Sequence, residues 1–322
     1  MKYKINKNET KTENNRTLYR IYADEDFNLR RIYADEDFRL CRTHIGEDFN
    51  AAVGQEVKKG TKGGWVENES NLSQDGCCWV AGEACVYGEA KVYGNAQVYG
   101  NAKVYGSAQV YGNAEVCGSA QVYDNAQIYN NATVRGMARV HGMACVYHNT
   151  FVLDNADVHD KAKVYHHAKV YGNARVYGEA EVYGNAKVHG NAQVCGNAKV
   201  CGEALVHAYS KVYDDARICD RAQVYGYARV HGNALVYNKS IVFDHAEIGD
   251  DAQVGGEAQI YGGAKLFGNA EAYDKAHIYG YAQLYDNIKV CGDMRVCGDV
   301  KVCGDMRVCG DVKVCGDIRL IN

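Results

Sequence analysis

The sequence predicts an all-β chain that winds into a solenoid of short strands, and three observations predict it. From Val80 to Leu320 one six-residue pattern, most often V-Y-G-N-A-K, repeats without insertion or deletion. Two apolar positions in every six residues would be spread around all faces of a helix, whereas they suit short strands joined by tight corners. The composition agrees, because the 322 residues include 35 glycines and 26 tyrosines but no proline. Self-similarity of this kind is typical of repeat architectures.

Each position of the repeat has its own predicted role, counting Val80 as position 0. Positions 0 and 4 are mostly Val and Ala, so both are predicted to point into the solenoid. Positions 1 and 5 flank position 0 and face outward by the alternation of a strand. Position 2 is mostly Gly, Asp or Asn, with His148, His166 and Ala208 as the exceptions. Such residues are the ones found in left-handed backbone, so position 2 is predicted to form the corner.

This pattern of an aliphatic residue, a Gly, Asp or Asn corner and a small residue at the fifth place resembles the hexapeptide repeat of left-handed parallel β-helices. The resemblance implies that three hexads close one coil, so the 41 hexads from Val80 to Leu320 would form a single-stranded left-handed parallel β-helix of about 13–14 coils. It does not specify a function, because that fold hosts acyltransferases, γ-type carbonic anhydrases and proteins that are not enzymes.

Two regions are predicted, an N-terminal capping region at residues 1–79 and the β-helix at residues 80–322. The capping region contains Arg20–Phe27, which recurs at Arg31–Phe38, and then the sequences G-G-W-V and N-L-S. A cap of this kind followed by hexads resembles the uncharacterised bacterial and phage proteins of the YdcK-like kind. The duplication departs from the single copy expected there, so no fold is predicted for residues 18–40.

Two tryptophans lie close to the predicted start of the solenoid. Trp65 belongs to the G-G-W-V sequence, and Trp79 directly precedes the first hexad. We expect both side chains to plug the first coil.

The hexads of residues 285–322 are a variant of the repeat. At position 4, Ala is replaced by Ile288, Met294, Val300, Met306, Val312 and Ile318. Position 1 becomes cysteine, at Cys291, Cys297, Cys303, Cys309 and Cys315. We expect a wider core here, an outward ladder of Asp and Lys or Arg, and an open C-terminal edge with unpaired strand groups. Cys291 stacks on Cys309 and Cys297 on Cys315, but parallel side chains disfavour the disulfide dihedral, so reduced thiols are expected.

Composition and charge exclude several classes of protein. The net charge is −4 and the isoelectric point is about 6.3, so no basic field indicates nucleic acid. No signal peptide and no long apolar run are present, so a cytoplasmic protein without membrane contact is expected. Most of the 14 cysteines share a repeat phase and are expected to be reduced and structural.

Histidines are candidate metal ligands, because pairs 18 residues apart would stack. The pairs are His141 with His159, His189 with His207, and His148 with His166. Stacked imidazoles can bind a metal. However, His148 and His166 replace a corner residue, and the others replace an outward tyrosine. We therefore expect no metal site, and the three convergent histidines of a γ-type carbonic anhydrase are not evident.

No catalytic residue and no cofactor are predicted. The acyltransferases of this fold interrupt the helix with a loop that shapes the acyl-donor site, and often add a C-terminal helix. Here the phase does not break between Val80 and Leu320. A trimeric enzyme of the hexapeptide-repeat acyltransferase type is kept as the alternative.

Tyrosine ladders are the most suggestive surface feature. Outward Tyr87, Tyr105 and Tyr123 are predicted to stack on one another. Outward apolar residues also share one column, namely Phe151, Leu205 and Ile241. The ladders either stabilise the faces or bind a protein, a glycan or another copy of the chain. The sequence favours a non-catalytic structural or interaction scaffold, self-associating through the tyrosine-bearing faces or the C-terminal edge.

Overall fold

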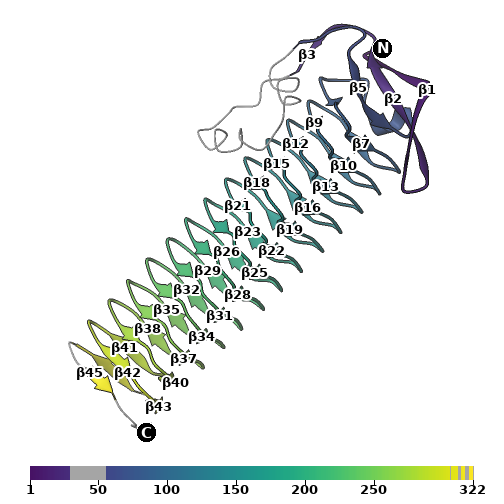
Figure 1. Cartoon of the computed structure of the whole chain (residues 1–322). Coiled ribbons are helices and arrows are strands. Elements are labelled where there is room, and N and C mark those ends of the chain that lie inside the picture. Colours follow the sequence, from purple (N-terminus) through teal and green to yellow (C-terminus); the bar gives the residue numbers. More distant parts are fainter. Residues whose placement is uncertain (30–55, 305, 311–312, 316–318, 322) are drawn as a thin grey trace. The chain divides into compact units, whose positions relative to one another are not determined.

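The computed structural model describes residues 1–29, 56–304, 306–310, 313–315 and 319–321 (Figure 1). The chain divides into two compact units, Met1–Lys161 and Ala162–Asn322, and each is described by itself. Apart from one 3-10 helix, the regular elements of the described residues are strands. The predicted all-β parallel solenoid is confirmed in both units. The second copy of the duplicated segment, Arg31–Phe38, lies outside the described residues.

The first unit begins with a hairpin of β1 (Tyr3–Glu13) and β2 (Arg16–Ala23), which pair antiparallel. Asn14 and Asn15 form its turn with φ of 48° and 60°, the left-handed values that hairpin turns need. The inner strand β2 also pairs antiparallel with β5 (Lys62–Val66). Strand β5 in turn runs parallel to β7, so it joins the hairpin to the solenoid.

Three short elements complete this N-terminal part. Strands β3 (Phe27–Asn28) and β4 (Glu56–Val57) form an antiparallel pair. The 3-10 helix η3 (Glu69–Asn71) is capped by Asn68, whose side chain accepts the N–H of Ser70. It lies between β5 and the first hexad, which begins at Val80.

Each solenoid strand of the first unit is two residues long and pairs in parallel with the strand 18 residues away. Val104 of β10, for example, lies between Val86 of β7 and Val122 of β13. This register confirms that three hexads make one coil. The strands are β6 (Trp79–Val80), β7 (Cys85–Val86), β8 (Lys91–Val92), β9 (Gln97–Val98), β10 (Lys103–Val104), β11 (Gln109–Val110), β12 (Glu115–Val116), β13 (Gln121–Val122), β14 (Gln127–Ile128), β15 (Thr133–Val134), β16 (Arg139–Val140), β17 (Cys145–Val146), β18 (Phe151–Val152) and β19 (Asp157–Val158).

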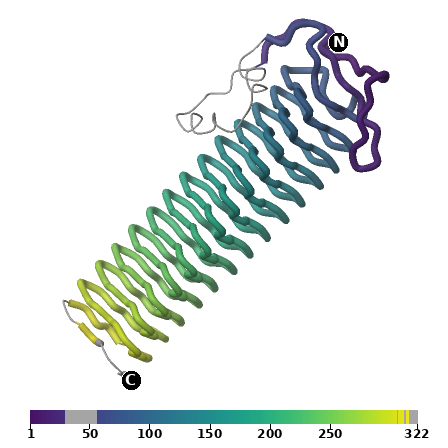
Figure 2. The backbone as a smooth tube through the Cα atoms, in the orientation of Figure 1, coloured from purple at the N-terminus to yellow at the C-terminus, as the bar shows by residue number. Residues whose placement is uncertain are grey.

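The second unit continues the same pattern, and its successive coils are similar in the backbone trace (Figure 2). Strands from β41 onward are three residues long. The strands are β20 (Lys163–Val164), β21 (Lys169–Val170), β22 (Arg175–Val176), β23 (Glu181–Val182), β24 (Lys187–Val188), β25 (Gln193–Val194), β26 (Lys199–Val200), β27 (Leu205–Val206), β28 (Lys211–Val212), β29 (Arg217–Ile218), β30 (Gln223–Val224), β31 (Arg229–Val230), β32 (Leu235–Val236), β33 (Ile241–Val242), β34 (Glu247–Ile248), β35 (Gln253–Val254), β36 (Gln259–Ile260), β37 (Lys265–Leu266), β38 (Glu271–Ala272), β39 (His277–Ile278), β40 (Gln283–Leu284), β41 (Lys289–Cys291), β42 (Arg295–Cys297), β43 (Lys301–Cys303), β44 (Arg307–Cys309), β45 (Lys313–Cys315) and β46 (Arg319–Ile321).

The corners lie at position 2, as predicted. Gly172 has φ of 70°, and the non-glycine corners His148, His166 and Ala208 have φ of 62°, 64° and 60°. These values fall in the left-handed region, where a β-branched side chain is strained. The absence of β-branched residues from this position therefore follows from the backbone.

Aspartate at a corner has a further role that the sequence analysis missed. The Asp214 carboxylate accepts the backbone N–H of Gly232, the corner residue one coil later, at 3.2 Å. Asp244 does the same for Gly262 at 3.2 Å. The side chain of such a corner thus links two neighbouring coils, in addition to tolerating the left-handed backbone.

Replacing Asp214 by valine is expected to lower the free energy of unfolding by about 2 kcal/mol. The substitution places a β-branched residue at φ of 57° and removes one hydrogen bond. Asp214→Gly removes the same bond but relieves the backbone, so it is expected to cost less than about 1 kcal/mol. Urea denaturation of the three proteins measures the difference. Equal loss in both variants would contradict this account of the corner.

The interior is filled by positions 0 and 4, as predicted. Val188 and Ala192 have no exposed surface. Three position-4 residues are polar instead, namely Thr150, Ser210 and Ser240. Each hydroxyl donates to the backbone carbonyl three residues earlier, so the buried polar group is satisfied.

Larger position-4 residues enter the interior near the C-terminus. Ile288, Met294 and Val300 are buried, and Met306 is half-buried. Val312 and Ile318 lie outside the described residues.

The two tryptophans are buried, but the expectation that they plug the first coil is wrong. Trp65 pairs in register with Cys85, and Trp79 pairs with Gln97. Cys85 and Gln97 occupy the outward position 5 of the repeat. The tryptophan side chains therefore lie on the outer face. Trp65 packs there with Leu18 of the hairpin. The ring centroids of Trp79 and Phe27 are 5.4 Å apart.

The expectation of reduced thiols is wrong for Cys291, which forms a disulfide with Cys309. Their Cα atoms are 4.5 Å apart, within the range that a disulfide spans. The in-register pairing of β41 and β44 sets this separation. Rotation about each Cα–Cβ bond brings the sulfur atoms together, which the argument from parallel side chains neglected. Cys297 is disulfide-bonded as well.

Candidate functional site

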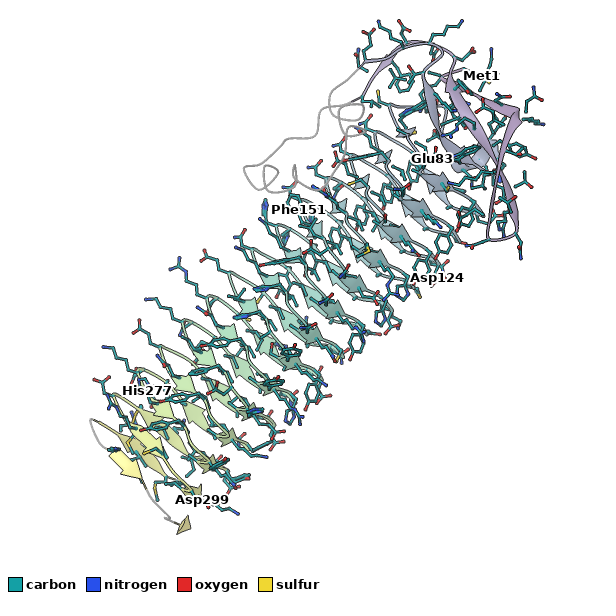
Figure 3. The ribbon with its side chains drawn as sticks, in the orientation of Figure 1. Met1, Glu83, Asp124, Phe151, His277 and Asp299 are labelled. Carbon is teal, nitrogen blue, oxygen red and sulfur yellow. A yellow bond between two sulfur atoms is a disulfide. The ribbon has the colours of Figure 1, made fainter. Side chains whose placement is uncertain are left out.

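The outer face of each unit carries side chains in rows, one from each coil (Figure 3). Three kinds of outward feature have a geometry that bears on function. They are columns of stacked rings, a buried carboxylate in the first unit, and a pair of cysteines in the second unit.

Two ring columns lie on the first unit. Tyr87, Tyr105 and Tyr123 stack with ring centroids 5.1 and 4.9 Å apart, which confirms the predicted ladder. His141 and His159 extend this column at 4.6 and 4.9 Å. The second column consists of Tyr93, Tyr111, Tyr129 and Tyr147, whose neighbouring centroids are 4.8, 4.9 and 4.8 Å apart. The spacing equals that of neighbouring strands, so the backbone register positions the rings.

A longer column lies on the second unit. Its rings are Tyr171, His189, His207, Tyr225, Phe243, Tyr261 and Tyr279. Burial lowers the pKa of His189, helped by the charges of His207 and Lys187, and burial also lowers the pKa of His207. Both imidazoles are therefore held more strongly in the neutral form, which suits rings stacked among tyrosines.

The predicted histidine stacks are confirmed for His141 with His159 and for His189 with His207. His148 and His166 lie at left-handed corners in different units, and each ring lies against the tyrosine that precedes it. Within the part of the chain that the structure describes, no group of three or more His, Cys, Asp or Glu side chains is arranged to hold a metal ion.

The predicted apolar column does not form a continuous patch on the second unit. Leu205 and Ile241 are half-buried, and both pair in register with Gln223, which lies between them. Phe151 lies on β18 of the first unit and is also half-buried.

A buried carboxylate lies on the first unit at an outward position of the repeat. Glu115 is 2% exposed and its neighbour Gln97 is 3% exposed. The Tyr99 hydroxyl donates to the Glu115 carboxylate at 3.4 Å. Burial raises the pKa of Glu115 to about 7, although the Tyr99 hydrogen bond and the charge of Arg135 oppose the shift. The hexad pattern contains no signal for this site, because Glu115 has the same position as many exposed charged residues.

The cysteine pair directly follows β26 and β29 of the second unit, on neighbouring coils. The Sγ atoms of Cys201 and Cys219 are 2.8 Å apart, and both residues are half-buried. A hydrogen bond from Cys219 lowers the pKa of Cys201 to about 7, against burial and with help from a Tyr183 hydrogen bond. The same contact raises the pKa of Cys219. The 18-residue spacing of these cysteines is visible in the sequence, but several cysteines share position 1 and nothing in the repeat marks these two as a pair.

A surface groove of about 540 Å³ adjoins the cysteine pair along the chain. Its charged lining residues include Glu203, Asp220, Arg221, Lys239 and Glu257. Arg221 pairs with Glu203 at 2.8 Å and Lys239 with Glu257 at 3.2 Å. Four of these charges therefore already compensate one another in two ion pairs, and Asp220 adds a further carboxylate.

Comparison with known proteins agrees with this architecture. A family model described as YdcK Beta solenoid repeat matches residues 96–112, 108–124, 126–142 and 216–232. The chain is a β-solenoid repeat protein, and these segments of it are similar to the YdcK repeat. The matched segments lie within the hexads of both units, so the resemblance of residues 1–79 to a YdcK-like cap stays a prediction. No curated protein matches the chain.

None of the described residues forms a helix with the length and hydropathy of a membrane span.

Proposed function

We propose that the chain is a non-catalytic scaffold that presents evenly spaced rows of side chains and associates with further copies of itself. The observation that supports this best is the spacing of the stacked rings, 4.6 to 5.1 Å from Tyr171 to Tyr279. A surface of this kind repeats the same chemistry along each unit. An enzyme instead needs different groups that converge on one reacting atom.

The unbroken backbone also supports a scaffold. Between residues 79 and 304 the described chain alternates strands and corners at every hexad. A loop of the kind that shapes the acyl-donor site in the acyltransferases of this fold would interrupt that alternation.

The surface proposed for self-association is an exposed row of rings at the corners of the second unit. Tyr209, Tyr227 and Tyr281 are 54%, 55% and 71% exposed. Tyr209 stacks on Tyr227 at 5.1 Å, and Tyr227 stacks on His245 at 4.9 Å. Gly263 is the next residue of the row, and the Tyr281 ring lies so close that a Cβ there would be 2.9 Å from it. We call these residues the corner aromatic row.

Exposed tyrosines in such a row fit an interface. Tyrosine is enriched at protein–protein interfaces because its ring buries a large area while its hydroxyl stays hydrogen-bonded. A second copy offers the same evenly spaced row, so each ring can meet an equivalent ring at matching intervals.

The full-length protein is therefore expected to associate as its concentration rises. Sedimentation velocity over a dilution series measures this. Combining Tyr209→Ser, Tyr227→Ser and Tyr281→Ser is expected to weaken association at least about tenfold, because aromatic residues contribute most of the energy at interfaces.

The control is Asn191→Ser, which changes the same corner position one coil before Tyr209 and should leave association unchanged. Circular dichroism verifies that each variant keeps its β structure. Monomers at every concentration, or equal association of the triple variant, would contradict self-association through this row. Stoichiometric binding of acetyl-coenzyme A or zinc in calorimetry would favour the acyltransferase-type enzyme instead.

A further inference from the structure

The cysteine pair of the second unit has two sulfur atoms in close contact. Neither the stacking of tyrosine rings nor the proposed scaffold role explains this contact. Cys201 and Cys219 occupy position 1 on neighbouring coils, and their strands β26 and β29 pair in register. Their sulfur atoms are 2.8 Å apart, closer than two sulfur atoms that merely pack. Both side chains are half-buried, so they remain accessible to a small molecule.

The second unit itself shows that two cysteines in this register can be joined. Cys291 and Cys309 also occupy position 1 on neighbouring coils, and they form a disulfide with Cα atoms 4.5 Å apart. Strands β26 and β29 pair in the same parallel register, and Cys201 and Cys219 directly follow their last paired residues, Val200 and Ile218. The Cys201–Cys219 pair therefore needs no movement of the backbone to form a disulfide.

We infer that Cys201 and Cys219 are a reversible dithiol–disulfide site that reacts with low-molecular-weight aliphatic disulfides. Cys201 is the attacking residue, because the hydrogen bond from the Cys219 thiol, helped by one from Tyr183, stabilises its thiolate against burial and the charge of Asp220. Cys219 is the resolving residue, since its thiol keeps its proton next to that thiolate.

The reaction proceeds by two exchanges. The Cys201 thiolate attacks one sulfur of the small disulfide, whose S–S bond breaks, and the leaving thiolate takes up the proton that Cys201 released. Cys219 then loses its proton and attacks the Cys201 sulfur of the mixed disulfide, which releases the second small thiol. Two cysteine thiols are oxidised to one disulfide, and one small disulfide is reduced to two thiols. The new bond joins two neighbouring coils beside the charged groove.

Peptide mapping of the full-length protein tests this inference. The protein is incubated with a mixture of oxidised and reduced glutathione, free thiols are blocked with iodoacetamide, and the denatured protein is cut with trypsin. Cleavage after Lys199, Lys211, Arg217 and Arg221 places the two cysteines in separate peptides, 200–211 and 218–221. The expected product is these two peptides joined by a disulfide, and dithiothreitol is expected to separate them.

Cys195 is a matched control within the same digest. It occupies position 1 and is half-buried, but the residues in register with it are Tyr177 and Tyr213. Cys201 is expected to react about fivefold faster than Cys195, because a second thiol lies 2.8 Å from its sulfur and can stabilise the attacking thiolate. The Cys219→Ser variant is expected to retain glutathione on Cys201, since the resolving thiol is gone.

Failure to find the joined peptides in the wild-type protein would overturn the inference, whether the cysteines are recovered alkylated or as separate glutathione adducts. Equal rates for Cys201 and Cys195 would overturn the assignment of Cys201 as the attacking residue. Both results come from the wild-type chain, so they do not depend on the folding of a variant.

Discussion

Replacing Arg20 by alanine is expected to lower the free energy of unfolding of the first unit by about 3 kcal/mol, because it removes a buried guanidinium that bonds two backbone carbonyls and packs on a tryptophan ring. Arg20 lies on β2 and its side chain is 7% exposed. The guanidinium donates to the carbonyls of Gly63 and Gly82 at 2.9 and 2.8 Å and to the Glu83 carboxylate at 2.8 Å. It also lies over the Trp65 ring, 3.7 Å from its centroid. One side chain thus holds the hairpin against the first corner of the solenoid.

The Arg20→Lys variant separates the contribution of the positive charge from that of the hydrogen bonds made by the planar guanidinium. Lysine keeps the positive charge but has one donor group in place of a planar fork, so it cannot reach both carbonyls and the carboxylate at once. We expect it to recover less than half of the lost stability. Hydrogen exchange of β5 and urea denaturation of each variant measure the effect. A loss in Arg20→Ala no larger than that of an exposed substitution, about 0.5 kcal/mol, would contradict the role of Arg20.

A fall in pH should weaken the contact between Arg20 and Glu83. Burial of Glu83 opposes ionisation, but hydrogen bonds from Arg20 and Trp65 and the charges of Arg20 and Lys11 lower the pKa of Glu83 to about 2. A carboxyl group with a lowered pKa contributes stability above its unfolded value, near pH 4.5, and loses it as the pH falls towards 2. Because the Glu83 side chain is half-exposed, solvent screening limits this contribution.

The hexad alone predicts the strands, corners and interior, because each position has one physical requirement. The φ of 70° at Gly172 and the complete burial of Val188 and Ala192 both follow from residue type and spacing. The prediction for the tryptophans failed because the repeat does not show which residues cover the outer face. Trp65 is buried by the hairpin, a contact between residues far apart in the sequence that no repeat pattern encodes.

The candidate sites were harder to predict for the same reason. Glu115 and Glu181 share position 5, yet one is buried and the other half-exposed. Cys291 and Cys309 differ from Glu115, because the repeat predicts their register. Only the prediction that their thiols are reduced was wrong. Cys291 and Cys309 were identified as stacked, and the error lay in treating the direction of the side chains as fixed.

Replacing Glu115 by glutamine is expected to stabilise the first unit at high pH and to leave it nearly unchanged at low pH. The pKa of Glu115 is raised to about 7 from 4.5, chiefly by burial. Between these values the folded protein keeps a proton that the unfolded chain has lost, so stability falls as the pH rises from 4.5 to 7. The loss amounts to about 3 kcal/mol once the carboxylate is ionised. Glutamine keeps the shape of glutamate and a carbonyl that can accept the Tyr99 hydroxyl, but it carries no charge.

Urea denaturation of wild type and Glu115→Gln at pH 4.5 and pH 8 measures the effect, with the gain expected at pH 8 only. Glu181→Gln is the matched control, because Glu181 also accepts a tyrosine hydroxyl, that of Tyr165 at 3.0 Å, and has the same position in the repeat. Its carboxylate pairs with Lys163 at 3.7 Å and reaches water, so its replacement loses an ion pair and should give no gain at pH 8. Position in the repeat, tyrosine partner and substitution are the same in both, so a difference reports the burial of Glu115 and the Lys163 ion pair of Glu181. Equal behaviour of the two variants would mean that the carboxylate of Glu115 is hydrated in solution.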